Sequence, residues 1–143
     1  MAEILLGSHV GMSGKEMFLG SVKEAESYGA NVLMVYTGAP QNTRRKEIGE
    51  LRIDEGISYA EKAGIREIVI HAPYIINLGN MEKPEMFDFG VEFLAKEVKR
   101  AAAFHSKVLV LHPGSSLSAS VEEAVEQIAK GLNLVLDADD SEV

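Results

Sequence analysis

Four short apolar segments recur along the chain and predict four β-strands. Each segment is rich in leucine or β-branched residues and does not alternate with polar residues, which is typical of strands buried on both faces of a parallel sheet. The segments start 28, 36 and 40 residues apart, and each gap has room for a crossover helix. The predicted strands are Ile4-Leu5-Leu6, Val32-Leu33-Met34-Val35-Tyr36, Ile68-Val69-Ile70 and Val108-Leu109-Val110-Leu111.

Apolar residues at helical spacing follow each of these segments and predict four α-helices. Residues that favour the start or the end of a helix flank the helical stretches. They are the pair Ser13 and Glu16 with Gly29 for the first helix, Gly64 for the end of the second, Pro84 for the start of the third, and the pair Ser120 and Glu123 for the start of the fourth.

The resulting order is βαβαβαβα, which right-handed crossovers fold into a parallel sheet with helices packed against it. Residues 1–143 then form a single α/β domain. Two architectures fit this order: half of a TIM barrel, that is (βα)4, and an open flavodoxin-like sheet with helices on both faces. A complete barrel typically needs about 250 residues, so the length of 143 residues favours the open sheet. The positions of the polar residues favour the half-barrel.

The composition is that of a globular protein, with 46% hydrophobic and 25% charged residues, which excludes a disordered or collagen-like chain. No apolar run approaches the ~18 residues of a membrane span, and the first seven residues lack the basic segment of a signal peptide. The absence of cysteine excludes a thiolate metal site and a disulfide framework; together these features predict a cytoplasmic protein. The formal net charge of −8 argues against nonspecific wrapping of nucleic acid. It is compatible with a site that meets phosphate through bound cations, because such ions add positive charge that the count omits.

Three of the four histidines lie where a predicted strand ends: His9, His71 and His112 follow the first, third and fourth strands. Ligands of parallel α/β folds bind at the carboxyl ends of strands, and histidines on adjacent strands can converge on one zinc ion. In the alternative interpretation, each histidine caps a strand end and hydrogen-bonds to the backbone. No acidic residue follows these strands directly, so histidines alone leave the site incomplete for hydrolysis at phosphate, which usually needs paired ions or a base.

Amide, aromatic and basic residues follow the same strand ends and suit contacts with nucleic acid. Gln41 and Asn42 carry side-chain amides that can hydrogen-bond to base edges. Tyr74 and Asn77 can stack on and bind a base or a sugar, although the same residues also fit simple loop packing. The basic cluster Arg44-Arg45-Lys46 is either a solvated loop or a group that holds phosphates beside the site.

Four segments at these positions together resemble endonuclease IV, the zinc-dependent apurinic/apyrimidinic endonuclease family of base-excision repair. The resemblance runs along the whole chain in order, and the block that begins at His71 is its most specific element. It implies a TIM-barrel enzyme that cleaves the phosphodiester 5′ to an abasic site with three zinc ions. The segments are Gly7-Ser8-His9-Val10, Tyr36-Thr37-Gly38-Ala39-Pro40-Gln41-Asn42-Thr43, His71-Ala72-Pro73-Tyr74-Ile75-Ile76-Asn77-Leu78-Gly79 and Leu111-His112-Pro113-Gly114.

The resemblance also implies roles for individual residues. His71 and His112 match two zinc ligands of the family. His9 matches a histidine near the metal centre that is not a principal ligand. The matches to DNA-binding residues are Tyr74, in a loop that enters the DNA at the lesion, and Gln41 and Asn42, in the loop that probes the minor groove.

The chain departs from the family pattern in two places. Ser115-Ser116 stand where the family commonly has a second histidine after the fourth strand, and His105-Ser106 stand where the third helix often ends with glycine. The family also continues into four more βα units, which supply a bridging glutamate and the remaining zinc ligands. The resemblance therefore covers the N-terminal half only, and it implies incomplete or weak zinc binding and a chain that is a poor or inactive nuclease alone.

The expected partners are abasic-site DNA for the complete enzyme and either a further copy of the chain or a chain that supplies the C-terminal half. Two other functions fit part of the pattern. A non-catalytic half-barrel that self-associates would cover the open first and fourth strands. A sugar-phosphate isomerase of the same superfamily also uses histidines and carboxylates at strand ends, although the loop at residues 36–43 argues against it.

Overall fold

The structure, a computed structural model, describes residues 4–143 and confirms the predicted alternation of strands and helices. Residues 1–3, with which the segment considered for a signal peptide begins, lie outside the described residues. Within residues 4–143, no helix is long and apolar enough to cross a membrane. The elements are β1 (Gly7–His9), α1 (Met17–Ser27), β2 (Val32–Tyr36), a short 3₁₀ turn η1 (Ile48–Glu50), α2 (Ile53–Ala63), β3 (Glu67–His71), α3 (Pro84–Ala103), β4 (Val108–Val110) and α4 (Val121–Asp137).

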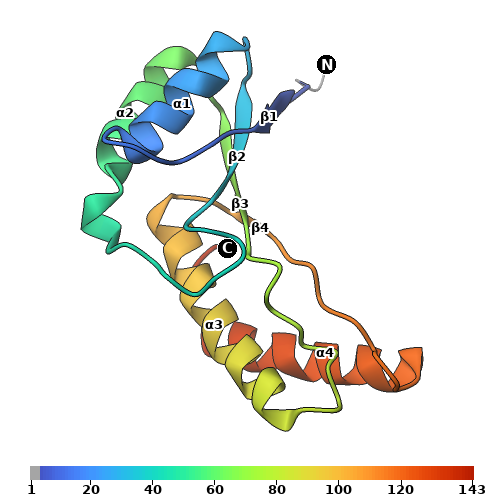
Figure 1. The fold of residues 1–143 in the computed structure, drawn as a ribbon. Helices are drawn as coiled ribbons and strands as arrows, with labels where there is room; N and C mark the ends of the chain where they lie inside the picture. The colour runs from blue at the N-terminus through green and yellow to red at the C-terminus, as the bar shows by residue number, and fades with distance from the viewer. Residues whose placement is uncertain (1–3) are drawn as a thin grey trace.

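The four strands form one parallel sheet in the order β1-β2-β3-β4, which Figure 1 shows as a strongly twisted ribbon. A flavodoxin-like sheet has the order 2-1-3-4-5, because its chain reverses direction across the sheet. Sequential order is instead the arrangement of a TIM barrel, in which each strand lies beside the next one along the chain. The strand order therefore selects the half-barrel and excludes the open flavodoxin-like alternative.

Only one face of the sheet is buried. Leu33, Val35 and Ile70 point to the helices and are at most 1% exposed. Because side chains alternate along a strand, Met34 and Val69 lie on the opposite face and are only half-buried. The prediction of burial on both faces is thus wrong for this second face. The interior of a complete barrel is filled by side chains from all its strands, and the four strands described here do not fill it.

The first strand lies three residues later than its apolar segment predicts. Ile4 and Leu6 are 81% and 75% exposed and precede β1. Their backbone is bound by the side chain of Asn31, whose Oδ1 accepts from the Leu6 N–H at 2.7 Å and whose Nδ2 donates to the Ile4 carbonyl at 3.0 Å. Pairing with β2 starts only at Gly7, where a Cβ would overlap the Val32 carbonyl. A distant asparagine therefore holds the segment that precedes the ladder.

Two residue pairs are predicted to cap the start of a helix, and only one of them does so. Ser120 caps α4 as predicted: its Oγ accepts from the Glu123 N–H at 3.2 Å, and the Glu123 carboxylate accepts from the Ser120 N–H at 3.1 Å. The box at Ser13 and Glu16 does not form, because α1 begins at Met17 without a side-chain cap. Ser13 forms a single antiparallel bridge with Met17 instead.

Three helices end in the same way, with one residue in the left-handed conformation. Gly29 follows α1 with φ 70°, Gly64 follows α2 with φ 76°, and His105 follows α3 with φ 55°. In each case the next N–H donates to a carbonyl five residues back, which satisfies a free acceptor of the last turn. These pairs are Ala30 with Ala25, Ile65 with Ala60, and Ser106 with Ala101. Gly29 and Gly64 are thus confirmed as helix stops.

We expect His105→Gly to raise the free energy of unfolding by about 0.5–1 kcal/mol. A left-handed conformation costs an L-residue about 1–2 kcal/mol, and the greater freedom of glycine in the unfolded chain offsets part of the gain. The measurement is urea unfolding with a constant m-value. His105→Ala, which keeps the Cβ, is the control, and equal stability of the two variants would contradict the prediction.

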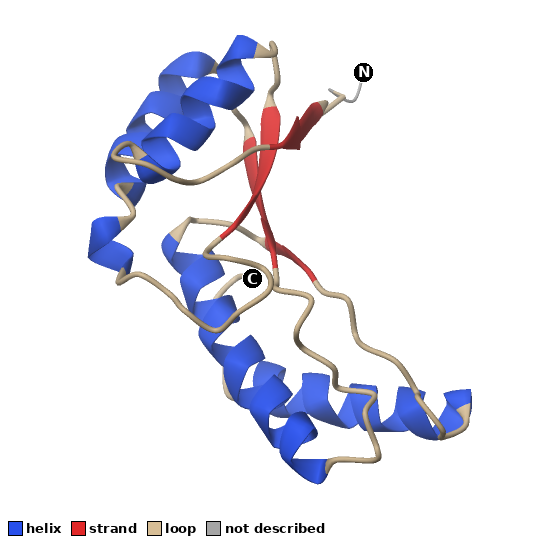
Figure 2. Cartoon of the chain, viewed as in Figure 1, coloured by secondary structure: helices blue, strands red, loops and turns tan. Residues whose placement is uncertain are grey.

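The helices pack in pairs, α1 on α2 and α3 on α4 (Figure 2). One hydrophobic cluster lies under α1 and α2, where the Phe18 and Phe104 rings meet edge to face at 4.8 Å. A second cluster joins α3 to α4 and includes Phe93 and Val135. The two clusters hold the sheet so that its carboxyl edge and the loops after it stay accessible.

Candidate functional site

The carboxyl edge of the sheet brings together the three histidines that the sequence places there. His9 ends β1, His71 ends β3, and His112 comes two residues after β4. The ring centroids of His71 and His112 are 4.9 Å apart, and those of His9 and His71 are 6.4 Å apart. His105 lies elsewhere, at the end of α3. The predicted convergence at one edge is therefore what the structure shows.

Tyr36 is a member of this cluster that sequence reasoning did not single out. It ends β2 directly beside His71 in the strand register. Its ring centroid lies 4.8 Å from that of His9 and 4.8 Å from that of His71. The signal was its place as the last residue of an apolar strand, since a tyrosine there carries an aromatic ring to the polar edge of the sheet.

A backbone hydrogen bond orients the ring of His71. Its Nδ1 lies 2.6 Å from the carbonyl oxygen of Ala72, and the residue is only 7% exposed. Because a carbonyl only accepts, Nδ1 carries a proton, which leaves Nε2 as the nitrogen that can bind a metal ion. Metal-binding histidines are typically oriented in this way by their second nitrogen.

His9 is held in its neutral form. Burial of part of its ring and the neighbouring His71 lower the pKa of His9 from its ordinary value of 6.5. At neutral pH, His9 is therefore uncharged and adds no repulsion to a cation bound at the edge.

The protein donors at this edge form an incomplete metal site. Across residues 4–143, no group of three or more histidine, cysteine, aspartate or glutamate side chains is placed to hold a metal ion. Zinc usually takes three or four protein ligands. The pair of His71 and His112 fits part of such a site through the chemistry of its donors and through the fixed tautomer of His71.

The loops that carry the two histidines are fastened to each other. The Asn77 Oδ1 accepts from the Ser115 N–H at 3.0 Å and from the Gly79 N–H at 3.1 Å. Gly114 adopts φ 118°, and a Cβ there would overlap the Asn77 side chain. Asn77, considered above as a ligand for a base or sugar, thus has a structural partner, and it keeps the loop after His71 beside the loop after His112.

The residues assigned to DNA contacts lie in two loops at the same edge. Gln41 is exposed, Asn42 is half-buried, and Tyr74 is 53% exposed. The Asn42 Oδ1 accepts from the Arg44 N–H at 2.9 Å, which ties this side chain to its own loop. A cavity of about 550 Å³ beside the first of these loops has walls formed by His9, Tyr36 and residues 37–40 and 44–46, among others.

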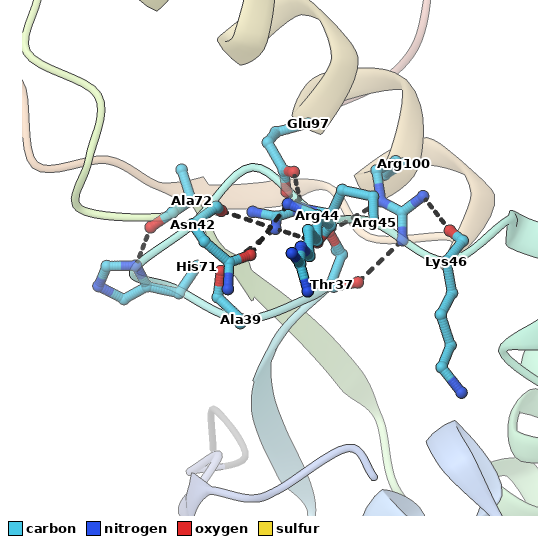
Figure 3. A network of polar contacts seen from close by, with 10 residues as sticks. All are labelled: Thr37, Ala39, Asn42, Arg44, Arg45, Lys46, His71, Ala72, Glu97 and Arg100. Atoms are coloured by element: carbon cyan, nitrogen blue, oxygen red, sulfur yellow. Dashed lines mark hydrogen bonds and ion pairs between the residues drawn. The ribbon is translucent and has the colours of Figure 1, made fainter.

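A buried polar network lies behind the loop after β2 and was not predicted (Figure 3). Glu97 of α3 is fully buried; it pairs with Arg45 and accepts a hydrogen bond from Thr37. Arg100, one turn further along α3, also binds Thr37. Arg45 is therefore engaged inside the protein, and of the basic cluster only Arg44 and Lys46 are exposed.

Comparison with known proteins gives consistent matches. Residues 22–143 match the family described as Xylose isomerase-like TIM barrel. A "Probable endonuclease 4" of Lachnoclostridium phytofermentans is 60% identical over 134 residues, which cover 94% of this chain and 45% of that protein. The "Probable endonuclease 4" of Bacillus subtilis is 53% identical over 132 residues, which cover 92% and 44%. The chain thus spans about half the length of the curated relatives it matches.

Solved structures show the same arrangement. Endonuclease IV from Thermus thermophilus superposes with a TM-score of 0.69 and 28% identity, over 91% of this chain and 47% of that one. A D-psicose 3-epimerase superposes with a TM-score of 0.62 over 92% of this chain and 48% of that one. Its 14% identity shows only that the fold is shared.

Proposed function

The chain belongs to the Xylose isomerase-like TIM barrel family, and on this basis we propose that residues 1–143 form one domain that is the first half of a DNA repair endonuclease of the endonuclease IV type. The complete barrel cleaves the phosphodiester 5′ to an abasic site. The observation that carries the proposal is the pair His71 and His112, with ring centroids 4.9 Å apart at the carboxyl edge of neighbouring strands. The relatives named probable endonuclease 4 support it.

His71 and His112 would hold one zinc ion of the complete site. A bound zinc ion would lower the pKa of a water molecule and stabilise the leaving oxygen of the phosphodiester. The hydrogen bond between Nδ1 and the Ala72 carbonyl would leave Nε2 of His71 as the ligating nitrogen. His9 stays neutral at the rim of the site. The remaining ligands, and the other two zinc ions that the resemblance implies, belong to the four further units of the barrel.

The two loops at the edge would recognise the lesion. The exposed Tyr74 ring fills the gap left by a displaced nucleotide, since stacking of a base on an aromatic side chain is worth about 1–3 kcal/mol. Asn42 contributes its amide nitrogen, while its oxygen accepts from the Arg44 N–H within the loop. This donor suits the minor groove, where the bases present mainly acceptors. Gln41 is exposed and offers both donor and acceptor.

Reconstitution of the barrel tests this function. We expect the chain, combined with the missing half of the Bacillus subtilis relative and zinc, to incise abasic duplex DNA on the 5′ side of the lesion. Either half alone should be inactive or nearly so. Incision products are resolved on a denaturing gel, and intact duplex is the control substrate. Absence of incision by an assembled, zinc-loaded barrel would overturn the proposal.

A second candidate function, a self-associating scaffold of the cytoplasm without catalysis, is favoured by the open face of the sheet. Val108 of β4 is 44% exposed, and β1 and β4 each pair on one side only among the described strands. A second copy related by a two-fold axis could cover both features. Solution mass separates the two functions: the scaffold requires a metal-free assembly of at least twice 15.5 kDa that persists when the second half is added.

Zinc binding by the chain alone should be weak. Two histidines leave at least half of a tetrahedral shell to water, so we expect at most one zinc ion per chain, lost on dialysis against a chelator. His71→Ala or His112→Ala should abolish this binding, whereas His105→Ala should not change it. Titration calorimetry and metal analysis after dialysis measure the effect. Three tightly held ions per chain would contradict it.

A further inference from the structure

We propose that Arg45 is a positioning residue that fixes the loop at residues 38–46 in its DNA-reading shape before DNA arrives, through a clamp formed with Thr37, Glu97 and Arg100. The role of the loop in reading DNA rests on the proposed function. The clamp consists of contacts within the chain.

The loop is folded around the Arg45 guanidinium. Its Nη1 donates to three backbone carbonyls of the loop, those of Ala39 at 3.2 Å, Asn42 at 3.1 Å and Arg44 at 2.8 Å. These carbonyls lie outside any strand or helix, so one side chain replaces the hydrogen bonds that regular structure supplies elsewhere. The guanidinium also lies over the Phe93 ring, 5.0 Å from its centroid.

Helix α3 anchors this guanidinium and both ends of the loop. The Arg45 Nε donates to Glu97 Oε1 at 2.6 Å, and the Thr37 hydroxyl donates to Glu97 Oε2 at 2.8 Å. Arg100 donates to the Thr37 carbonyl at 2.8 Å and to the Lys46 carbonyl at 2.9 Å. The start, the centre and the end of the loop are therefore all bound to one helix.

Every buried side-chain nitrogen and oxygen of the clamp has a hydrogen-bond partner. Glu97 is 0% exposed and Arg100 is 8% exposed. Throughout the described part of the chain, no buried side-chain nitrogen or oxygen lacks a hydrogen-bond partner. A buried charge pair holds one geometry when every member is bonded, and it becomes strongly unfavourable when one partner is lost. Such a network favours one loop shape over many.

Gly38 provides a second, independent sign that the loop is built around Arg45. A Cβ at Gly38 would lie 2.7 Å from the Arg45 Cδ and 2.8 Å from its Nη1. The guanidinium thus occupies space that only a glycine leaves open. Gly38→Ala displaces Arg45 without removing its charge or any of its partners.

The consequence is a loop that presents residues outward without having to order itself. Gln41 and Arg44 are exposed, whereas Arg45 is directed inward. A preorganised loop avoids the entropy cost of fixing backbone and side chains on binding. Loosening the clamp should therefore weaken binding of abasic DNA and leave the bond-breaking step unchanged.

Trypsin measures the clamp on the chain itself, because cleavage after Arg44 or Lys46 requires the loop to open. We expect Arg45→Lys, which keeps the charge but not the fork of donors, and Gly38→Ala to speed cleavage within residues 44–46 at least about tenfold. Arg44→Lys, the same substitution one position earlier, should leave the rate unchanged. Unchanged loop cleavage in both variants overturns the proposal. Equal acceleration after Lys62 in α2 also overturns it, because the variants would then be unfolded overall.

The reconstituted barrel measures the consequence for DNA. We expect Arg45→Lys and Gly38→Ala to raise KM for abasic duplex about tenfold with kcat within twofold of the unmodified barrel. Glu92→Gln, on the exposed side of the same helix, should change neither value. A fall in kcat with KM unchanged overturns the positioning role. If the unmodified barrel does not cleave abasic DNA, the proposed function fails, and the trypsin comparison still decides whether Arg45 holds the loop.

Discussion

Phe18→Ala is expected to lower the free energy of unfolding by about 3–5 kcal/mol, which is the usual cost of removing a fully buried phenylalanine. Phe18 is 0% exposed and meets Phe104 edge to face at 4.8 Å. A Cβ at Gly56 would overlap its ring, so α2 closes the space around it. Because α1, α2 and the end of α3 all contact this ring, the cavity left by alanine cannot collapse easily.

Urea unfolding followed by circular dichroism measures the loss, and Phe89→Ala is the matched control. Phe89 is only half-buried and stacks on Phe93 at 5.5 Å, so the same substitution should cost clearly less. Equal losses of unfolding free energy in the Phe18 and Phe89 variants would show that the cluster under α1 and α2 is not the more tightly packed one.

In the reconstituted barrel, His71→Ala is expected to reduce single-turnover cleavage of abasic DNA by about 100-fold or more. Loss of a residue that only orients a metal ligand typically costs about 10–100-fold, so loss of a ligand should cost at least as much. Tyr74→Ala should leave the cleavage step intact and reduce the preference for abasic over intact duplex by about tenfold, since stacking of about 1–3 kcal/mol is lost.

Two assays separate these roles: equilibrium binding to abasic and intact duplexes, and single-turnover cleavage at saturating enzyme. His105→Ala, remote from the edge, is the control for both. The roles would be assigned the wrong way round if Tyr74→Ala left abasic binding unchanged while His71→Ala abolished binding but not cleavage.

The bounds of a strand were predictable where residues within it and directly beside it in the sequence determine them. β2 coincides with the apolar run at 32–36, because the run is bounded by polar residues on both sides. β1 could not be located in this way. Ile4 and Leu6 are as apolar as a strand requires, but the amide of Asn31, 25 residues after Leu6, binds the backbone there. A contact of that range leaves no periodic signal in the sequence.

The residues of the candidate site also differ in whether the sequence predicts them. His71 and His112 were predictable because each directly follows a recognisable strand. The clamp was not predicted, since Arg45 and Glu97 are 52 residues apart. One sign was present: Glu97 stands at helical spacing from Phe93 and Ala101, on the apolar side of its helix. A carboxylate in that position requires a buried cationic partner.

Helix α3 contributes to both hydrophobic clusters, with Phe93 in one and Ala101, followed by Phe104, in the other. Glu97 and Arg100 lie on the stretch of helix between them. Neither cluster can therefore come apart without disturbing the helix that the other needs. The two clusters should therefore unfold in a single cooperative transition, with equal calorimetric and van't Hoff enthalpies. Native-state hydrogen exchange of the α3 amides should report the global free energy of unfolding.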